Sequence, residues 1–413
     1  MARNQRARLY GAMIESVARR GYADTTVANV LALAGVSRRA FYELFDNKED
    51  CFLATHDSVV ARSRKLTLEA WGRERGWANR LHAGCKALLD DIAASPKGPR
   101  LALVDAFGAG PNVRVRIILA GRVFERMVGF AFSSAPEGPE MSRLTSKAIV
   151  GGVRHVLSVR LREGREKELQ TLTEEVLDLC EAYHSPFAAR LREITEDAGH
   201  GRSTVRPPAE FLPLGDDRAR SLVSVAHLTF DEGYEELTDP QIAEFAGIST
   251  EAFHRHFANK EEAFLALLDE VAKHALERVS ERTDGGGSWA QTVQSALEAL
   301  LDFAATHEGL MRVAFIELFA VGPGVIDRVT GLVDGFTLSL TQGAPEPRHA
   351  PLIAEDAVSG ALWGVISSGV AGKRLARLPR LVEHLSFIVL APYIGAEPAF
   401  EAIVARRGTQ APG

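Results

Sequence analysis

The sequence predicts an all-α protein in which one helical architecture is present twice in tandem. Apolar residues recur at the three- and four-residue spacing of amphipathic helices, and Gly- and Pro-rich breaks separate these stretches. Blocks of similar residues also recur at a constant offset of 212 positions. With 413 residues, the chain has room for two copies of a fold that each contain more than one domain.

The internal repeat is strongest near the start of each copy. Gly21-Tyr22 recurs as Gly233-Tyr234, and Asn47-Lys48-Glu49 recurs as Asn259-Lys260-Glu261. The residues between these blocks match at the same offset without a gap: Thr26 with Thr238, Ala34-Gly35 with Ala246-Gly247, Ser37 with Ser249, Ala40-Phe41 with Ala252-Phe253, and Phe45 with Phe257. A fainter match joins residues 148–153 to 357–362 at an offset of 209. We therefore distinguish copy 1 (residues 1–185) from copy 2 (residues 216–400).

Copy 1 is predicted to be helical throughout. A first helix over Gln5–Arg20 has an apolar face that contains Leu9, Met13, Ile14 and Val17. The longer helices expected further along the chain are Lys48–Trp71, Trp77–Ala94, Arg100–Ala109, Val113–Phe132, Ser142–Arg162 and Arg165–His184. Copy 2 is expected to repeat this scheme.

The stretch Asp24–Lys48 has the pattern of two short helices joined by a tight turn. Thr25 or Thr26 can cap the first helix with its hydroxyl group. Gly35 is placed to end that helix, where a left-handed backbone is needed, and Ser37 can cap the second helix. The pattern predicts a helix-turn-helix.

The second helix of this stretch presents a basic surface. Arg38, Arg39 and Tyr42 are expected to point outward, whereas Phe41 and Phe45 are expected in the core. Arginines at the exposed start of such a helix suit the major groove of DNA. The alternative is an ordinary helical hairpin with a solvated basic tip.

Residues 8–55 resemble the DNA-binding domain of the TetR family of bacterial transcriptional regulators. The residues that carry the resemblance are Gly21-Tyr22, the run from Thr25 to Val30, Ala34-Gly35-Val36-Ser37, Phe41-Tyr42, Phe45 and Asn47-Lys48-Glu49. Arg39 stands where the family often has a small residue, which adds capacity for a phosphate or guanine contact.

The resemblance implies a set of DNA contacts. In copy 1 they are Thr25, Thr26, Ser37, Arg38, Arg39, Tyr42 and Lys48. Weaker contacts are expected in copy 2 at Thr238, Ser249, Thr250, His254 and Lys260. The alternative for Tyr42 is a half-buried ring beside Phe45. A basic N-terminal arm is either a further backbone contact or a disordered tail, and its residues are Arg3, Arg6 and Arg8.

The two predicted DNA-reading regions differ in charge. Residues 1–50, called head 1, contain eight Lys and Arg against six Asp and Glu, a net charge of +2. Residues 213–262, called head 2, contain four against eleven, a net charge of −7. The outward residues Arg38, Arg39 and Tyr42 of head 1 correspond to Thr250, Glu251 and His254 of head 2. Because phosphate contacts supply most non-specific affinity, we expect copy 1 to make the main DNA contact.

The larger part of each copy should form a ligand-binding domain, as the resemblance implies. Aromatic and Met side chains are the candidates for its pocket: Trp77, Phe107, Phe124, Met127 and Phe130 in copy 1, and Phe315, Phe319 and Trp363 in copy 2. The alternative is that these residues are plain core. Lone histidines without a suitably spaced partner predict no metal site, and no cofactor is expected.

The resemblance implies an overall architecture of two tandem TetR-like units. Each has an N-terminal three-helix helix-turn-helix domain and a helical ligand-binding and dimerisation domain. The expected boundaries are 1–50 and 51–185 for copy 1, 186–215 for a linker, 216–262 and 263–400 for copy 2, and 401–413 for a tail. In the family the last two helices form a four-helix dimer bundle, so Ser142–His184 and Glu355–Ile394 are expected to pack the chain as an intramolecular pseudo-dimer.

These features together predict a sequence-specific transcriptional regulator, with a repressor released by a small-molecule effector as the expected form. Its partners would be a double-stranded DNA operator and the effector, and the chain would act as a monomeric pseudo-dimer or as a homodimer of fused chains. The alternative is a helical interaction or ligand-sensing protein with vestigial DNA binding. The sequence shows no nucleophile or phosphate-loop motif, so an enzyme is not expected. Neither is a membrane partner, since no apolar run is long enough to span a bilayer, and the expected location is the cytoplasm.

Overall fold

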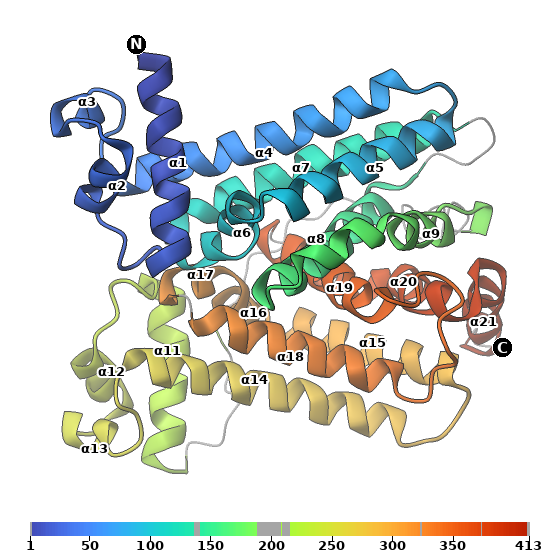
Figure 1. Ribbon diagram of the computed structural model, residues 1–413. Helices are drawn as coiled ribbons and strands as arrows, with labels where there is room; N and C mark the ends of the chain where they lie inside the picture. Colours follow the sequence, from blue (N-terminus) through green and yellow to red (C-terminus); the bar gives the residue numbers. More distant parts are fainter. Residues whose placement is uncertain are drawn as a thin grey trace. The chain divides into compact units, whose positions relative to one another are not determined.

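The structure is a computed structural model that describes residues 2–135, 141–187, 208, 215–322, 324–372 and 374–410. These residues form helices and connecting turns without a β-strand, which confirms the predicted all-α fold (Figure 1). They divide into two compact units. Unit 1 contains residues 1–184 and 350–360, and unit 2 contains residues 185–349 and 361–413.

Head 1 is a three-helix domain built from α1 (Ala2–Arg20), α2 (Val27–Ala34) and α3 (Arg38–Tyr42). Its helices form around a shared apolar core, in which Leu9, Met13, Val30, Phe41 and Phe45 are buried. Thr26, and not Thr25, caps α2 by accepting a hydrogen bond from the Asn29 amide. Gly35 ends α2 with φ 57°, a left-handed conformation that favours glycine.

The rest of copy 1 is a helical domain that follows head 1. Its elements are α4 (Lys48–Arg73), α5 (Trp77–Ala94), α6 (Lys97–Leu103), η1 (Asp105–Gly108), α7 (Pro111–Ser133), α8 (Arg143–Arg162), η2 (Glu166–Thr171) and α9 (Thr173–Tyr183). In Figure 1, α4 leads away from head 1, and α5 and α7 run beside it.

Two helices predicted as continuous are divided in the structure. The stretch 100–109 is split between α6 and η1, and the stretch 165–184 is split between η2 and α9. In the second case the 3₁₀ geometry of η2 aligns side chains three residues apart. This brings Leu169 and Leu172 to the same side, and both are buried.

Unit 2 repeats this order of elements. Head 2 consists of α11 (Asp217–Glu232), α12 (Asp239–Ala246) and α13 (Thr250–His254). The elements that follow are α14 (Lys260–Thr283), α15 (Trp289–Thr306), α16 (Glu308–Arg312), the π-helical turn η3 (Val313–Glu317), α17 (Leu318–Val321), α18 (Gly324–Thr341), α19 (Ala354–Ala371), η4 (Leu375–Leu381), α20 (Val382–Ile394) and α21 (Ala396–Gln410).

The end of the chain differs from the predicted tail at 401–413. As far as Gln410 these residues continue the helix α21. Phe400 and Ile403 on this helix are buried, and α21 packs against α15 and α20. The expected linker 186–215 lies almost entirely outside the described residues.

A short segment of copy 2, residues 350–360, belongs to unit 1 and packs closely against α8. A Cβ atom added to Gly152 would lie 2.6 Å from the Ala357 carbonyl oxygen. A Cβ atom added to Gly360 would be at least as close to the Gly151 carbonyl oxygen. Nearby, Arg160 donates to the Asp356 carboxylate at 2.8 Å. The glycines are therefore required by the contact of two helix backbones. The wider pseudo-dimer arrangement of the two copies stays a prediction.

Candidate nucleic-acid interface and ligand cavity

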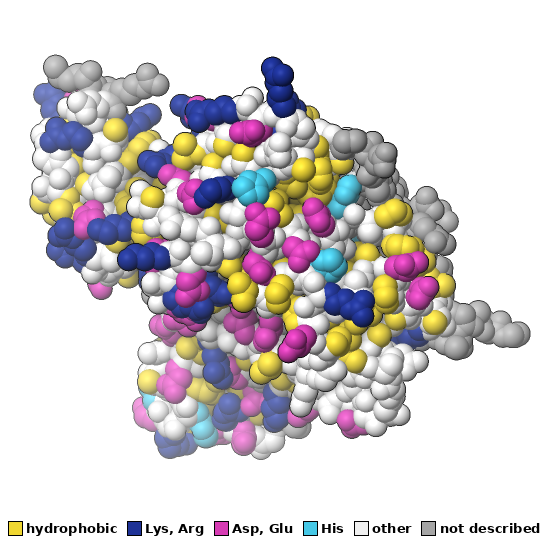
Figure 2. Space-filling view, turned by 45° about the vertical axis from the view of Figure 1, so that its right-hand side comes forward, with side chains coloured by type: hydrophobic (Ala, Val, Ile, Leu, Met, Phe, Trp, Pro, Cys, Tyr) yellow, Lys and Arg dark blue, Asp and Glu magenta, His cyan; other side chains and the backbone are white. Residues whose placement is uncertain are grey.

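The outer face of head 1 is exposed and basic. Thr26, Ser37, Arg38, Arg39 and Tyr42 are all exposed. The Arg39 side chain is 90% exposed and pairs with Glu43 at 3.0 Å one turn along α3. In Figure 2, several Lys and Arg side chains lie on the α1–α3 region at the upper left, with few Asp and Glu side chains between them.

Ser37 and Tyr42 lie at the two ends of α3. Ser37 caps α3 by accepting a hydrogen bond from the Ala40 amide at 3.2 Å. The Tyr42 ring packs edge-on against Phe41 at 5.3 Å and lies under the Arg38 guanidinium at 5.8 Å. Its exposed fraction is 47%, and it packs against Phe41 instead of the Phe45 of the alternative interpretation.

Thr25 cannot contact DNA in this fold, which corrects its place among the predicted contacts. Its side chain is 1% exposed. The hydroxyl donates to the Gly21 carbonyl oxygen at 2.8 Å and lies 3.1 Å from the Ser16 hydroxyl. Thr25 therefore ties the loop after α1 to α1 itself.

The side chain of Lys48 has a structural role, whereas a DNA contact by its backbone amide stays a prediction. Its ammonium group donates to the carbonyl oxygens of Tyr22 at 3.0 Å and Ala23 at 3.4 Å, and it lies 4.2 Å from the centre of the Tyr22 ring. Burial lowers the pKa of Lys48, and it raises the pKa of Tyr22 to about 12. The side chain thus holds the start of α4 against the loop after α1.

Head 2 has the same contact in a stronger form. The Lys260 ammonium donates to the carbonyl oxygens of Tyr234, Glu235 and Leu237 at 3.1, 3.2 and 2.7 Å. It lies 4.7 Å from the Tyr234 ring centre. The Lys260 side chain therefore has a structural role, and its predicted DNA contact stays a prediction. Tyr22 and Lys48 recur as Tyr234 and Lys260 in the copy that lacks the arginines. This recurrence was a signal in the sequence for a structural contact between Tyr and Lys.

The predicted N-terminal arm is part of the helix α1. Arg8 donates to the Gly35 carbonyl oxygen at 2.9 Å, and the Arg6 guanidinium lies 5.6 Å from the centre of the Phe45 ring. Arg8 therefore satisfies the C-terminal end of α2. The side chain of Arg3 lies outside the described residues.

The outer face of head 2 lacks the basic character of head 1. Thr238 and Ser249 cap α12 and α13, as their counterparts do. Thr250 is half-buried, Glu251 is exposed, and His254 Nε2 lies 3.8 Å from an Asp239 carboxylate oxygen. In Figure 2 this region at the lower left shows acidic and His side chains among the basic ones.

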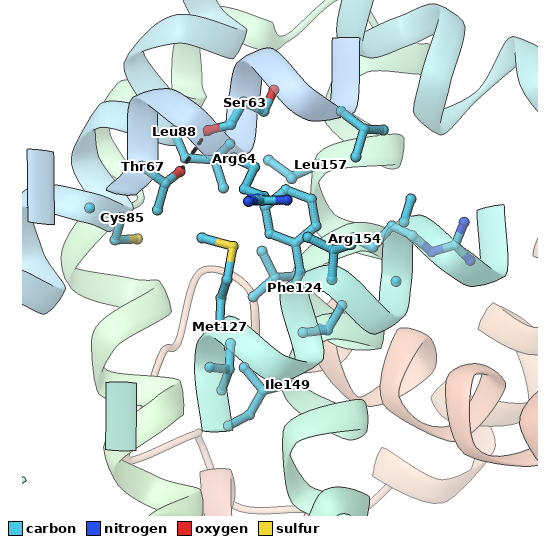
Figure 3. A pocket seen from close by; sticks show the side chains of 18 of the residues that line it. Ser63, Arg64, Thr67, Cys85, Leu88, Phe124, Met127, Ile149, Arg154 and Leu157 are labelled. Carbon is cyan, nitrogen blue, oxygen red and sulfur yellow. Dashed lines mark hydrogen bonds between the residues drawn. The ribbon is translucent and has the colours of Figure 1, made fainter. Parts of the chain in front are cut away.

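A cavity of about 580 Å³ lies within the helical domain of unit 1. This volume is within the usual range for small-molecule sites. Residues from α4 to α9 line it, and most are apolar, such as Leu88, Phe124, Met127, Ile149 and Leu157 (Figure 3). Sequence reasoning missed most of the aliphatic lining, because an apolar helix face has the same pattern in a filled core.

Three of the five predicted pocket residues of copy 1 line this cavity: Phe124, Met127 and Phe130. The other two are packing residues. Trp77 donates from Nε1 to the Ala131 carbonyl oxygen at 2.6 Å and packs edge-on against Phe132 at 5.4 Å. Phe107 is 8% exposed and lies under the Arg154 guanidinium at 5.0 Å.

The aromatic candidates of copy 2 also contribute to packing. The rings of Phe315 and Trp363 stack on each other at 4.6 Å, and Phe319 is buried. The alternative interpretation of these residues as plain core agrees with their contacts.

The charge of the unit 1 cavity is positive. Its lining contains Arg64, Arg126 and Arg154 and no Asp or Glu. Burial raises the pKa of the Cys85 thiol to about 12 and lowers the pKa of His56, so both groups are neutral at neutral pH. Burial also lowers the pKa of Arg154 to about 10, which still leaves it charged.

The polar positions of this cavity on α4 and α5 are all apolar in copy 2. At the offset of 212 the exchanges are His56 to Leu268, Ser63 to Ala275, Arg64 to Leu276, Thr67 to Val279 and Cys85 to Leu297. The ligand-type features of the cavity therefore belong to copy 1.

Within the described residues, no helix is long and apolar enough to cross a membrane. The same part of the chain contains no group of three or more His, Cys, Asp or Glu placed to hold a metal ion.

The folds of head 1 and head 2 define a tandem helix-turn-helix protein. A family model described as bacterial regulatory proteins, tetR family, matches residues 12–55 and again residues 224–267. The chain therefore carries two regions in tandem that match the tetR family, one overlapping head 1 and one overlapping head 2.

Relatives match only parts of the chain. The nucleoid occlusion factor SlmA of Pasteurella multocida is 30% identical over 101 residues, which cover 24% of this chain and 51% of SlmA. The HTH-type transcriptional activator FasR of Mycolicibacterium smegmatis is 26% identical over 118 residues, which cover 29% of this chain and 54% of FasR. The chain thus spans about half the length of the curated relatives that it matches.

Among solved structures, the transcriptional regulator FadR from Bacillus subtilis in complex with stearoyl-CoA is 17% identical with a TM-score of 0.39. The match covers 42% of this chain and 96% of that chain. A TetR-like transcriptional regulator from Rhodococcus sp. RHA1 is 23% identical with a TM-score of 0.32, over 44% of this chain and 98% of that chain.

Proposed function

We propose that this protein is a sequence-specific transcriptional regulator, a repressor, in which head 1 is the main DNA reader. The observation that carries this proposal is the exposed pair Arg38 and Arg39 on a helix held by the head 1 core. Exposed arginines on such a helix can form bidentate hydrogen bonds with guanine in the major groove. Head 2 has Thr250 and Glu251 at these positions.

The alternative function is an interaction protein that no longer binds DNA. The acidic head 2 favours it, whereas the basic face of head 1 opposes it. Selection of bound duplexes from a random pool distinguishes the two. We expect enrichment of a sequence that contains a single or lopsided half-site. A palindrome would indicate that two chains each contribute head 1, and no enrichment would support the interaction protein.

We propose further that a small-molecule effector binds the unit 1 cavity and releases the DNA. One helix connects the two sites, since α4 begins at the Lys48 contact with head 1 and lines the cavity between His56 and Trp71. A ligand that shifts α4 would therefore also shift head 1. Such coupling requires different affinities of the ligand for the two positions of α4.

The chemistry of the cavity favours an amphipathic anion as the effector. The apolar walls would bury a hydrocarbon part. Arg64 has no ion-pair partner among the described residues, and in Figure 3 it extends from α4 toward the middle of the cavity. A carboxylate or similar group on the ligand would pair with this guanidinium.

The effector is tested by thermal unfolding of the full chain with dodecanoate and with dodecanol. We expect the carboxylate to raise the unfolding temperature more than the alcohol, because only the carboxylate can pair with Arg64. Arg64→Leu, the residue of copy 2, should remove this difference. Lys65→Leu on the same helix is the matched control, since Lys65 does not line the cavity. Equal responses to both compounds in the wild type would exclude the anionic effector.

A further inference from the structure

The start of α14 in head 2 is occupied by a carboxylate from the same head. Asp239 Oδ1 accepts a hydrogen bond from the Lys260 backbone amide at 2.8 Å. Asp239 is the first residue of α12, and Lys260 is the first residue of α14, so the two helix starts lie side by side. The first amides of a helix have no intrahelical acceptor and carry the positive end of the helix dipole. An anion at this position is therefore stabilised.

The equivalent position in head 1 is open. Val27 stands in place of Asp239 and carries no acceptor. Lys48 is the first residue of α4, a helix of 26 residues. Among the described residues, no group accepts a hydrogen bond from its backbone amide. Thr26 is exposed at the adjacent start of α2. Since this amide binds a carboxylate in head 2, the same amide in head 1 can bind a phosphate oxygen of DNA.

We propose that Asp239 acts as a built-in substitute for a DNA phosphate and closes head 2 against DNA. This inference rests on the proposed function, because it assumes that head 1 binds DNA through the open amide. The Asp239 carboxylate would take the hydrogen bond that a phosphate oxygen needs, and its charge would repel that phosphate. DNA binding by head 2 would therefore be weakened in two ways: by Asp239 at a helix start and by the absence of arginines from the outer face of α13.

The groups around Asp239 do not offset this effect. His254 Nε2 lies 3.8 Å from the carboxylate on one side. The Lys260 ammonium points to three backbone carbonyl oxygens instead. Glu251 is exposed on the same outer face, and Asp231 and Glu232 are exposed at the end of α11. A phosphate would therefore meet an occupied amide in acidic surroundings.

The test aims to restore DNA binding by head 2 in the full-length chain. DNA binding by head 1 is removed in the same chain by Arg38→Ala and Arg39→Ala. The triple change Thr250→Arg, Glu251→Arg and His254→Tyr gives α13 the outward residues of head 1. Affinity for a mixed-sequence duplex is then measured by fluorescence anisotropy with Asp239 in place and with Asp239→Val. We expect Asp239→Val to raise the affinity of the triple variant at least about 10-fold. The slope of log affinity against log salt concentration should steepen by about 0.9, as expected for one additional phosphate contact.

Two further variants separate this mechanism from a general charge effect. Glu244→Gln removes one negative charge from an exposed position of the same helix, and we expect less than about a 3-fold effect from it. Asp239→Asn retains an oxygen on the amide but loses the charge, so it should give an intermediate gain even if Asp239→Val folds poorly. Thermal unfolding of each variant reports folding.

The proposal is overturned if Asp239→Val and Glu244→Gln have equal effects, or if the triple variant binds equally well with Asp239 present. It is also overturned if neither the triple variant nor its Asp239→Val form binds although both are folded. Failure of the proposed function appears elsewhere, because the wild-type chain with head 1 intact would then show no sequence preference. The mixed-sequence duplex does not depend on an operator.

Discussion

Head 1 and head 2 have nearly the same core and opposite surfaces. Phe41 and Phe45 are buried in head 1, and their counterparts Phe253 and Phe257 are buried in head 2. The outward positions differ: Arg38, Arg39 and Tyr42 of head 1 correspond to Thr250, Glu251 and His254 of head 2. The same fold can therefore carry different exposed surfaces, because the core determines stability and the exposed residues determine recognition.

The helical domains of the two copies differ in the same sense. The copy 1 domain contains a cavity with polar residues on α4 and α5, and copy 2 has apolar residues at each of these positions. This difference supports the proposal that copy 1 reads DNA and binds the effector. The following predictions test this division, beginning with the largest expected effect.

Replacement of both arginines of α3 should have the largest effect. We expect Arg38→Ala with Arg39→Ala to weaken binding to the selected operator about 100-fold, since each bidentate contact contributes about 1–3 kcal/mol of discrimination. The matched change in head 2 is Thr250→Ala with Glu251→Ala, and it should alter affinity less than about 3-fold. Gel-shift titration measures both. Equal losses in the two heads would remove the proposed asymmetry.

The Lys–Tyr contact should affect stability in both heads, and more strongly in head 2. Lys260 donates to three carbonyl oxygens, whereas Lys48 donates to two. We expect Lys260→Met to destabilise head 2 by about 1–3 kcal/mol and Lys48→Met to have a smaller effect on head 1. Hydrogen exchange of α11 and α1 amides reports each head separately. A larger effect of Lys48→Met would contradict the structural ranking.

Asp105 should make the stability of unit 1 sensitive to pH. Burial raises the pKa of Asp105 to about 6, although Arg100 lies 3.9 Å away. Ionisation is therefore more costly in the folded state, so the free energy of unfolding should fall as the pH rises from about 4 to about 6. Asp105→Asn should remove this fall and stabilise unit 1 by about 1–3 kcal/mol at pH 7.

Thermal unfolding of wild type and Asp105→Asn at pH 4 and pH 7 measures this effect. Glu317→Gln is the control in unit 2, where Glu317 accepts a hydrogen bond from the Tyr234 amide at 3.2 Å. An identical pH dependence of wild type and Asp105→Asn would show that Asp105 is not the group responsible.

Substitution of Cys85 by Leu, the residue of copy 2, should have the smallest effect on stability. The cavity offers space for the larger side chain, so we expect a change of less than about 1 kcal/mol in the free energy of unfolding. The reverse change, Leu297→Cys, removes volume from a buried position and should destabilise unit 2 by about 1–3 kcal/mol. Denaturant titration compares the two. Cys85→Leu should also abolish stabilisation by dodecanoate while DNA binding remains.

Much of the fold could be predicted from the sequence because its signals are local or repeated. The helix Trp77–Ala94 was predicted with the bounds that the structure shows, since Gly76 and Ser95 flank an uninterrupted amphipathic pattern. The division at Leu172 was not predicted, because a 3₁₀ turn and an α-helix share the three-residue spacing of apolar side chains.

The candidate sites were predictable to different degrees. Arg38 and Arg39 could be placed outward because the helix period assigns Phe41 and Phe45 to the core. Trp77 was assigned to a pocket and instead binds the Ala131 carbonyl oxygen, since composition does not distinguish a lining ring from a packed one.

The sequence by itself determined the all-α class, the duplication, the helix-turn-helix and the unequal charge of the two heads, because these depend on residue type and spacing along the chain. Only the tertiary structure decided which of the polar residues form hydrogen bonds within the protein. Thr25, Lys48 and Asp239 each contact groups at least four residues away, and Lys48 and Asp239 reach across more than twenty. The direction of such a side chain depends on how helices meet, and the order of residues does not specify it.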